Sequence, residues 1–568
     1  MVDYEAALEY LGSFGKYQKL KFAMLFVMQT PVAFHMLAMS FLAAKVDHHC
    51  ALPGMKEAGF EPQDSECALN FSIPLVYNED KDDWEFSQCT RYSDVGIYSL
   101  GNLSCPYFAD KNETGERSAT KCDQGWWYDR TQYHESIFTE FDLVCEKKAM
   151  SNIAQALYML GVLLGSVGFG QLSDIIGRKK TLLPCLVLQI IFGVATAFAP
   201  DLTTFIIFRL IVGAACLGSF LSAYVAVTEM VGTDKRTLVA TWCQISFAFG
   251  LMIMALLAYL LRSWRHLQLT ISLINIPMLP LWWFMIESPR WLQSQGRDEE
   301  VERIIREAAK VNGVVVPESV FTTKKAEPKE DTGKYTVLDL VRTPNMRKRS
   351  IVIFFNWLVI TMVYYGLGLN TSSLGGNDYI NFALAGLVEI PALIGSIYAT
   401  DYFGRRYPHS ATLVLGGIAC LFTPYLAPPY VAKHLNPLSI TLAMVGKFAV
   451  TASFNIIYFW TAEMYPTVVR NVGVGTSSMW ARVGGVISPF VLLSDTAWGP
   501  LPYLIFGVLS MTAGAVALLL PETLGVPLPD TLEEGEHFRR KKPNPPRGKE
   551  VKEQEMRLTQ EDQTGNKV

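Results

Sequence analysis

Twelve long apolar blocks constrain this chain more than any other feature of its sequence. Each block is about 20 residues long, the length that an α-helix needs to cross the hydrocarbon core of a bilayer. Only 18% of the residues are charged, whereas soluble domains carry about 25%. The sequence therefore predicts an all-α membrane protein with 12 transmembrane helices, near residues 22–44, 149–171, 181–199, 203–228, 238–260, 267–286, 350–370, 379–400, 410–428, 438–461, 472–493 and 500–520.

The polar stretch 45–148, between the first two blocks, predicts a disulfide-rich extracellular loop. It holds six of the ten cysteines and three N-glycosylation sequons, and disulfides and N-glycans both belong outside the cytosol. We expect three disulfides of open connectivity; zinc is disfavoured because these cysteines contain no C-x-x-C pair. The residues concerned are Cys50, Cys67, Cys89, Cys105, Cys122 and Cys145, with glycosylation at Asn70, Asn102 and Asn112.

Charge predicts the orientation of the chain. The stretch 45–148 has 10 basic and 20 acidic residues, whereas the basic clusters 178–180, 235–236, 347–349 and 405–406 fall in loops of the opposite parity. Basic loops stay in the cytosol, so both termini should be cytosolic in a multi-pass protein of the plasma membrane. The net charge of −4 gives no basis for a nucleic-acid partner; the lipid bilayer is the expected surrounding.

The predicted spans divide the chain into five parts. Val301, Ile304, Ile305 and Ala308 recur at helical spacing in the linker, which predicts an amphipathic helix on the cytosolic face. The C-terminal tail has few large apolar residues, so we expect it to be disordered and available to cytosolic partners. The parts are a cytosolic N-terminus 1–21, a six-helix half 22–286, a cytosolic linker 287–349, a second six-helix half 350–520 and the tail 521–568.

An internal repeat relates the two halves. The run Asp174-Ile-Ile-Gly-Arg-Lys recurs as Asp401-Tyr-Phe-Gly-Arg-Arg, and a Glu with an Arg seven residues on occurs at Glu229 and again at Glu463. Glu287-Ser-Pro after the sixth span recurs loosely as Glu522-Thr after the twelfth. Three matches in the same order indicate two homologous, pseudo-symmetric six-helix halves.

The repeated charges predict a cytosolic gate. Glycine permits a tight turn, and the neighbouring acidic and basic groups could form ion pairs that exist when the cytosolic side is closed. The alternative is that these residues are static topology signals. The predicted gating residues are Asp174, Arg178, Glu229, Asp401, Arg405, Glu463 and Arg470.

Two parallel six-helix halves resemble the major facilitator superfamily, whose substrate site lies near the bilayer midplane between the halves. Within it, the cysteine-rich loop, the run Glu287–Leu292 and the run Ala462–Asn471 look like the organic cation, anion and carnitine transporter family. The runs Tyr364–Leu367 and Asn370–Asn377 are most similar to arthropod organic cation transporter-like proteins. The resemblance implies a polyspecific secondary transporter that works by alternating access.

Ionisable residues inside spans are costly and are the first candidates for a substrate site. Glu389 lies in the eighth span, where the resemblance implies cation binding, and Arg482 lies in the eleventh, where the family's anion and carnitine members have arginine. Together they would suit a zwitterion, its ammonium near Glu389 and its carboxylate on Arg482; the alternative is that the two pair with each other. Arg209 and Lys447 should lie near helix ends and snorkel or join the gate.

Aromatic faces should complete a site for an organic cation. Tyr365 matches a family pocket tyrosine, and Gln244 matches a family glutamine. The remaining candidates, each also explicable as ordinary packing, are Tyr364, Phe220, Phe247, Phe454 and Tyr458.

Other functions fit less well. A sugar porter shares the repeats but not the long loop, and a non-transporting cell-surface binding protein would leave Glu389 and Arg482 unexplained. The chain has no phosphate-binding loop and no catalytic motif, so we expect no enzyme, no cofactor and no metal site. Coupling to Na⁺ and to the membrane potential stay open as driving forces.

Overall fold

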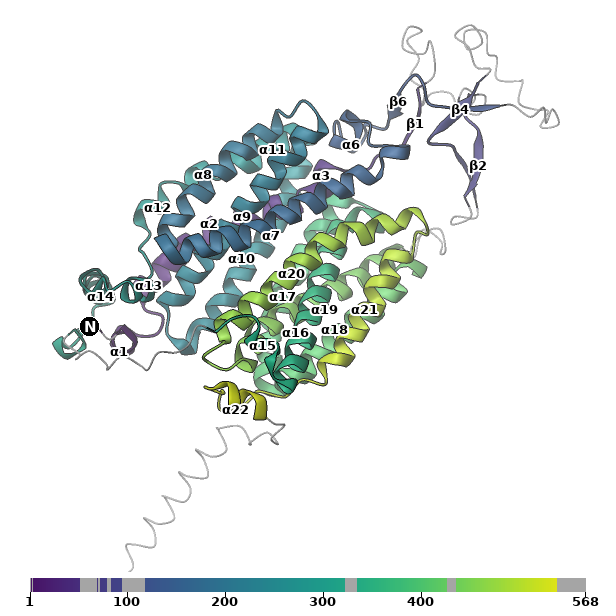
Figure 1. Cartoon of the computed structure of the whole chain (residues 1–568). Helices are drawn as coiled ribbons and strands as arrows, with labels where there is room; N and C mark the ends of the chain where they lie inside the picture. The colour runs from purple at the N-terminus through teal and green to yellow at the C-terminus, as the bar shows by residue number, and fades with distance from the viewer. Residues whose placement is uncertain are drawn as a thin grey trace, which may run out of the picture.

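The predicted spans fold as helices in one bundle, although the sixth is divided into two shorter helices (Figure 1). The computed structural model describes residues 2, 4–51, 69, 72–78, 83–93, 118–321, 335–426 and 436–538. The first half contains α2 (Lys16–Leu37), α3 (Met39–Leu42), α7 (Ala149–Ile176), α8 (Arg178–Ala197), α9 (Leu202–Met230), α10 (Arg236–Leu260), α11 (Trp264–Leu273) and α12 (Leu281–Phe284). The second half contains α16 (Pro344–Leu369), α17 (Asp378–Phe403), α18 (Arg406–Phe422), α19 (Asn436–Met464), α20 (Arg470–Leu493) and α21 (Leu501–Ala517).

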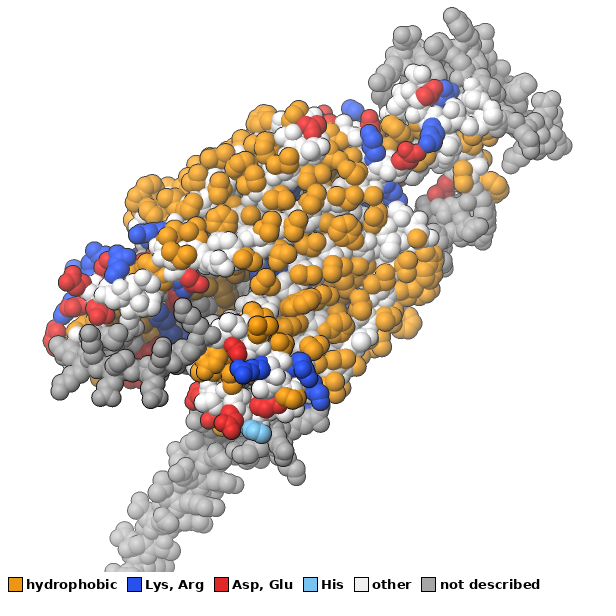
Figure 2. All heavy atoms as spheres, in the orientation of Figure 1, with side chains coloured by type: hydrophobic (Ala, Val, Ile, Leu, Met, Phe, Trp, Pro, Cys, Tyr) orange, Lys and Arg blue, Asp and Glu red, His pale blue; other side chains and the backbone are white. Residues whose placement is uncertain are grey.

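Length and composition agree with a membrane-spanning bundle. Nine helical stretches in the described part of the chain are long and apolar enough to cross a bilayer. The other three predicted spans correspond to α18 and α21, which have 17 residues each, and to α20, which carries two arginines. Figure 2 shows hydrophobic side chains covering one face of the bundle, with charged groups gathered toward its two ends. This distribution matches a protein whose middle faces lipid.

The two halves meet along two helix pairs. Helix α7 of the first half packs against α20 of the second, and α10 packs against α17. The largest buried apolar cluster belongs to the second half and includes Trp357 and Trp460. The first half has clusters of its own, and another cluster joins it to Tyr379 and Phe382 of α17. Phe247 and Tyr365 contact clusters of both halves. These two side chains therefore lie where the two halves pack against each other.

Short helices cover the bundle end opposite to the β-strands (Figure 1). The amphipathic linker helix is α14 (Asp298–Asn312), and its four apolar residues are buried. It packs against α1 (Tyr4–Leu11), and both lie near α13 (Pro289–Ser294). Helix α15 (Asp339–Arg342) precedes α16. Helices α13 and α14 of the linker are thus folded onto the first half, while α15 packs against α16 of the second.

The tail does not become disordered at residue 521, which corrects the sequence prediction. Thr523 is buried, and α22 (Leu532–His537) packs on the start of α16. The Glu536 carboxylate accepts hydrogen bonds from the Thr343 hydroxyl and from the amides of Asn345 and Met346. Burial alone would raise the pKa of Glu536, but these bonds lower it overall. Few apolar residues are needed here because a carboxylate caps the helix terminus; residues 539–568 lie outside the described part.

The loop after the first span contains short strands that its composition did not predict. Three antiparallel two-stranded sheets pair β1 (His48–Cys50) with β6 (Trp126–Tyr128), β2 (Leu75–Asn78) with β3 (Asp83–Phe86), and β4 (Thr90–Tyr92) with β5 (Ala119–Lys121). Strands of three or four residues give too short an alternation to be recognised from sequence.

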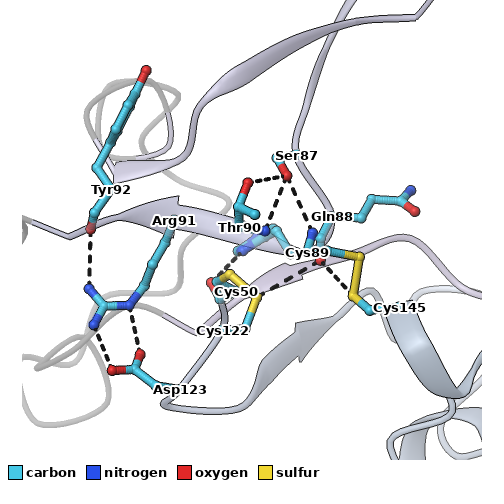
Figure 3. The surroundings of a disulfide bond; sticks show 11 residues. Cys50, Ser87, Gln88, Cys89, Thr90, Arg91, Tyr92, Cys122, Asp123 and Cys145 are labelled. Atoms are coloured by element: carbon cyan, nitrogen blue, oxygen red, sulfur yellow. Dashed lines mark hydrogen bonds and ion pairs between the residues drawn. A yellow bond between two sulfur atoms is a disulfide. The ribbon is translucent and has the colours of Figure 1, made fainter. Parts of the chain in front are cut away.

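Two disulfides connect these strands, as Figure 3 shows. Cys50 bonds to Cys122, and Cys89 bonds to Cys145, which lies just before α7. Cys67, Cys105 and the three sequon asparagines lie outside the described residues. The third predicted disulfide and the glycosylation sites therefore stay predictions.

An ion pair reinforces the disulfide-bonded region (Figure 3). The guanidinium of Arg91 donates two hydrogen bonds to the Asp123 carboxylate, at 2.8 and 3.0 Å. Because Arg91 donates these bonds, the pKa of the Asp123 carboxyl lies below its ordinary value. The side chain of Arg91 is buried, so this bidentate pair fixes the position of β4 next to the Cys50–Cys122 bond.

Candidate functional site

A buried ion pair lies in the interior of the second half. Glu389 of α17 is 2% exposed, and its Oε1 lies 2.9 Å from the Nζ of Lys447 on α19. The hydroxyl of Tyr364 on α16 donates to the same carboxylate oxygen at 2.7 Å. The Lys447 ammonium also lies 3.3 Å from the centre of the Tyr364 ring. A carboxylate, an ammonium and an aromatic ring from three helices thus form one cluster.

Lys447 corrects the sequence prediction for this site. It is 2% exposed and lies well inside α19, not near a helix end, so it neither snorkels nor reaches the cytosolic charges. It, and not Arg482, is the ion-pair partner of Glu389 among the described residues. A lysine within an apolar run is costly unless a carboxylate faces it, and that cost was the signal available in the sequence.

Arg482 lies apart from Glu389. Its Nη1 donates to the carbonyl of Ser478, one turn earlier on α20, at 3.2 Å, and its side chain is half-buried. The alternative of a direct pair between Glu389 and Arg482 is not seen among the described residues, while a role for Arg482 toward substrate stays a prediction.

Aromatic side chains surround the Glu389 cluster. The Phe454 ring stacks on Tyr364 with centroids 5.6 Å apart, and Tyr458 lies edge-on to Phe454 at 5.3 Å. Trp357, which the sequence did not single out, lies edge-on to Tyr458 with ring centroids 4.5 Å apart. Such rings offer a negative face to a cation. Three predicted aromatic residues are thus brought together beside the buried carboxylate.

The other predicted residues occupy different positions. Tyr365 lies edge-on to Tyr364, with centroids 5.4 Å apart, and its hydroxyl points to the sulfur of Met36 in the first half at 3.9 Å. Phe220 stacks on Tyr224, on the same helix α9, at 6.0 Å. Phe247 lies where the clusters of the two halves meet.

Gln244 links the two halves. Its Nε2 donates to the side-chain oxygen of Asn455 on α19 at 3.0 Å, and the amide of Asn455 donates to Ser396 on α17 at 2.8 Å. Asn455, absent from the sequence prediction, is therefore the hub of a polar chain across the interface.

Arg209 also differs from its prediction as a helix-end residue. It is 1% exposed, and its Nη2 donates to the main-chain carbonyl of His35 at 3.1 Å. The guanidinium lies 4.2 Å from the centre of the Tyr158 ring. Arg209 is buried within the first half, so it neither snorkels nor joins the predicted gate.

At the end of the bundle near α1, the first repeat forms a compact charge cluster. Arg178 donates two hydrogen bonds to the Glu229 carboxylate, both at 3.1 Å, and its Nη1 lies 3.0 Å from Asp174. Glu287 accepts the amides of Arg178 and Lys179, at 2.8 and 3.2 Å, at the N-terminus of α8. Carboxylates are stabilised at this end of a helix.

The second repeat has nearly the same geometry. Arg405 donates to Glu463 at 3.1 and 3.2 Å, and Glu522 accepts the amides of Arg405 and Arg406 at 2.9 and 3.0 Å. Asp401 is exposed and forms no counterpart of the Asp174–Arg178 pair within the described chain. Each cluster joins helices of one half.

Arg470 lies outside this cluster. Its guanidinium donates to the Tyr465 carbonyl at 3.3 Å and to the Thr467 hydroxyl at 3.2 Å. The sequence spacing from Glu463 placed it near the gate, but its hydrogen bonds hold the turn between α19 and α20.

The glycine in each repeat has a direct structural reason. Gly177 has φ +104° and Gly404 has φ +84°, a conformation that favours glycine. A Cβ on Gly177 would lie 2.3 Å from the Glu287 carboxylate, and one on Gly404 would lie 2.5 Å from Glu522. The two glutamates, which the sequence analysis recognised as repeats without assigning a role, therefore need glycine beside them.

Known proteins match this chain over most of its length. A family model described as "Sugar (and other) transporter" matches residues 95–533. The "Organic cation transporter protein" of Drosophila melanogaster is 42% identical over 553 residues, covering 96% of each chain. The human "Organic cation/carnitine transporter 2" is 36% identical over 538 residues, covering 94% of each. An inward-open xylose transporter structure from E. coli, 18% identical, has a TM-score of 0.54 over 71% of this chain and 93% of that chain, which indicates a shared fold.

Proposed function

Because the chain belongs to the organic cation and carnitine transporter family of the major facilitator superfamily, we propose that it carries small organic cations or zwitterions across the plasma membrane by alternating access. Several relatives that match nearly the full length carry organic cation or carnitine names, so a sugar porter is not favoured. The observation that carries the proposal is the buried Glu389 carboxylate beside aromatic rings.

The substrate ammonium binds where Lys447 now pairs with Glu389. Lys447 compensates the charge of the buried carboxylate at 2.9 Å. A substrate ammonium supplies the same charge and gains the faces of Tyr364 and Phe454, which already stack side by side. Exchange of one cation for another avoids leaving Glu389 unpaired during the cycle.

A zwitterion such as carnitine needs a second contact, for which we propose Arg482. Its guanidinium has a carbonyl partner in Ser478 and can offer further N–H groups to a carboxylate. The membrane potential, worth about 2.3 kcal/mol per charge per 100 mV, drives a monovalent cation but not a neutral zwitterion. Carnitine uptake would therefore require Na⁺ or exchange.

The loop 45–148 is extracellular and both termini are cytosolic in this proposal. Two disulfides support an oxidising surrounding for the loop. Helices α1, α14 and α22 lie at the other end of the bundle (Figure 1). The Arg178 and Arg405 clusters are at that end, where we propose that they form and break as the cytosolic side closes and opens.

Uptake into proteoliposomes tests the proposal. Labelled tetraethylammonium and carnitine are supplied with and without Na⁺ and an imposed potential. Glu389→Gln should reduce uptake of both more than tenfold, whereas the exposed Glu9→Gln should change neither. Absence of uptake of both compounds by the reconstituted wild type would contradict the proposal.

The role of Arg482 is tested by the contrast between the two substrates. Arg482→Ala should weaken carnitine uptake by about 30-fold, equivalent to about 2 kcal/mol, and leave tetraethylammonium nearly unchanged. The exposed Arg130→Ala is the matched control. Equal loss of both substrates would assign Arg482 to the conformational cycle.

A further inference from the structure

A cavity lies between the halves, at the bundle end that carries the loop. Its volume is about 250 Å³, and it is lined by residues of both halves, including Ser40 and Gln155 from the first and Asp495 from the second. Lys45 and Asp495 form an ion pair across it at 3.3 Å. The Glu389 cluster does not contribute to its walls. The cavity is therefore separate from the proposed transport site.

Three oxygen atoms in these walls lack a hydrogen-bond partner within the described structure. They are Oδ1 of Asp495, Oε1 of Gln155 and Oγ of Ser40, all shielded from solvent. Gln155 is 3% exposed, and its Nε2 donates to the Met36 carbonyl at 3.5 Å, which leaves its oxygen as the free group. Burying acceptors without donors is unfavourable, so the cavity is suited to a ligand that donates.

The ligand chemistry follows from the charge and the acceptors. Asp495 has one oxygen on Lys45 and the other unpartnered, and two uncharged oxygen atoms complete the set. A protonated primary amine has three N–H donors and one positive charge, which matches three acceptors of which one is anionic. A quaternary ammonium has no N–H and cannot satisfy them.

We propose that this cavity is an external binding site for small protonated primary amines, distinct from the Glu389 site. The amine donates to Asp495, Gln155 and Ser40 and so contacts both halves at once. Because these residues meet only while the outer ends of the halves are together, an occupied site favours that arrangement. The site requires no particular transport substrate.

Thermal unfolding of the purified full chain in detergent, titrated with n-propylammonium or tetraethylammonium, tests the proposal. n-Propylammonium should stabilise wild type and Glu389→Gln with similar apparent affinity and bind Asp495→Asn at least tenfold more weakly. The exposed Asp47→Asn makes the same charge change outside the cavity and should behave as wild type. If Asp495→Asn does not fold, Ser40→Ala, which removes one acceptor, should weaken n-propylammonium by a smaller factor.

Two results would overturn the external site: no stabilisation of wild type by n-propylammonium, or a response unchanged in Asp495→Asn and Ser40→Ala but lost in Glu389→Gln. Tetraethylammonium separates this outcome from the fate of the proposed function. It should respond to Glu389→Gln and not to Asp495→Asn, so either site can fail while the other stands.

Discussion

Removing Lys447 should expose how the buried carboxylate is stabilised. At 2.9 Å, two unit charges in a medium of effective dielectric constant 20 attract by about 6 kcal/mol, which the cost of burying both charges largely offsets. Lys447→Met keeps the apolar stem but leaves Glu389 buried and uncompensated. We expect a loss of about 3–5 kcal/mol in the free energy of unfolding.

A double-mutant cycle isolates the pair. Lys447→Met, Glu389→Gln and the double variant are unfolded by denaturant in detergent micelles, with the exposed Lys310→Met as the matched control. Either single change leaves one buried charge without its partner, whereas the double variant removes both charges. The double variant should therefore lose about 2–3 kcal/mol less than the sum of the single losses.

Substrate should partly replace the missing lysine. Tetraethylammonium at 100 times its Kd stabilises a protein by about 2.7 kcal/mol. Its affinity for Lys447→Met should exceed that for wild type, because it no longer competes with Lys447 for Glu389. Additive costs in the cycle, together with an unchanged affinity for tetraethylammonium, would refute the proposed exchange of cations at Glu389.

Three further predictions concern parts outside this site. Glu463→Ala should lower the uptake rate more than it raises the Kd for substrate, because the ion pair of Glu463 with Arg405 lies outside the proposed substrate site at Glu389. A raised Kd with an unchanged uptake rate would rule out a gate. Cys89→Ser should leave Cys145 alkylatable without reduction, and a blocked Cys145 would disprove their bond. Glu536→Gln should speed hydrogen exchange in α22. Because the pKa of Glu536 is lowered in the folded protein, the wild-type protection of α22 should be complete above the ordinary carboxyl pKa and should be lost as the pH falls through the lowered pKa.

Several features of this protein follow from the sequence alone. The spans, the two repeated halves and the buried face of α14 depend on hydropathy and spacing along one helix, which neighbours in the chain encode locally. The repeat also predicted gating residues that include Arg178 and Glu229 in one half and Arg405 and Glu463 in the other. In the structure each of these two pairs forms an ion pair. The docked segment after residue 521 was missed because much of its attachment comes from hydrogen bonds of Glu536, which a hydropathy pattern does not reveal.

Only the tertiary structure decided which charges meet inside the bundle. The sequence predicted Glu389 and Arg482 in the middle of their spans and Lys447 near a helix end. A helix turns about 100° per residue, so which charges pair depends on how each helix is rotated and packed. That rotation brings Lys447 next to Glu389, whereas Arg482 donates to the carbonyl of Ser478 on its own helix. Packing between the halves likewise creates the cavity at Asp495, because its acceptors come from chain segments that no local pattern connects.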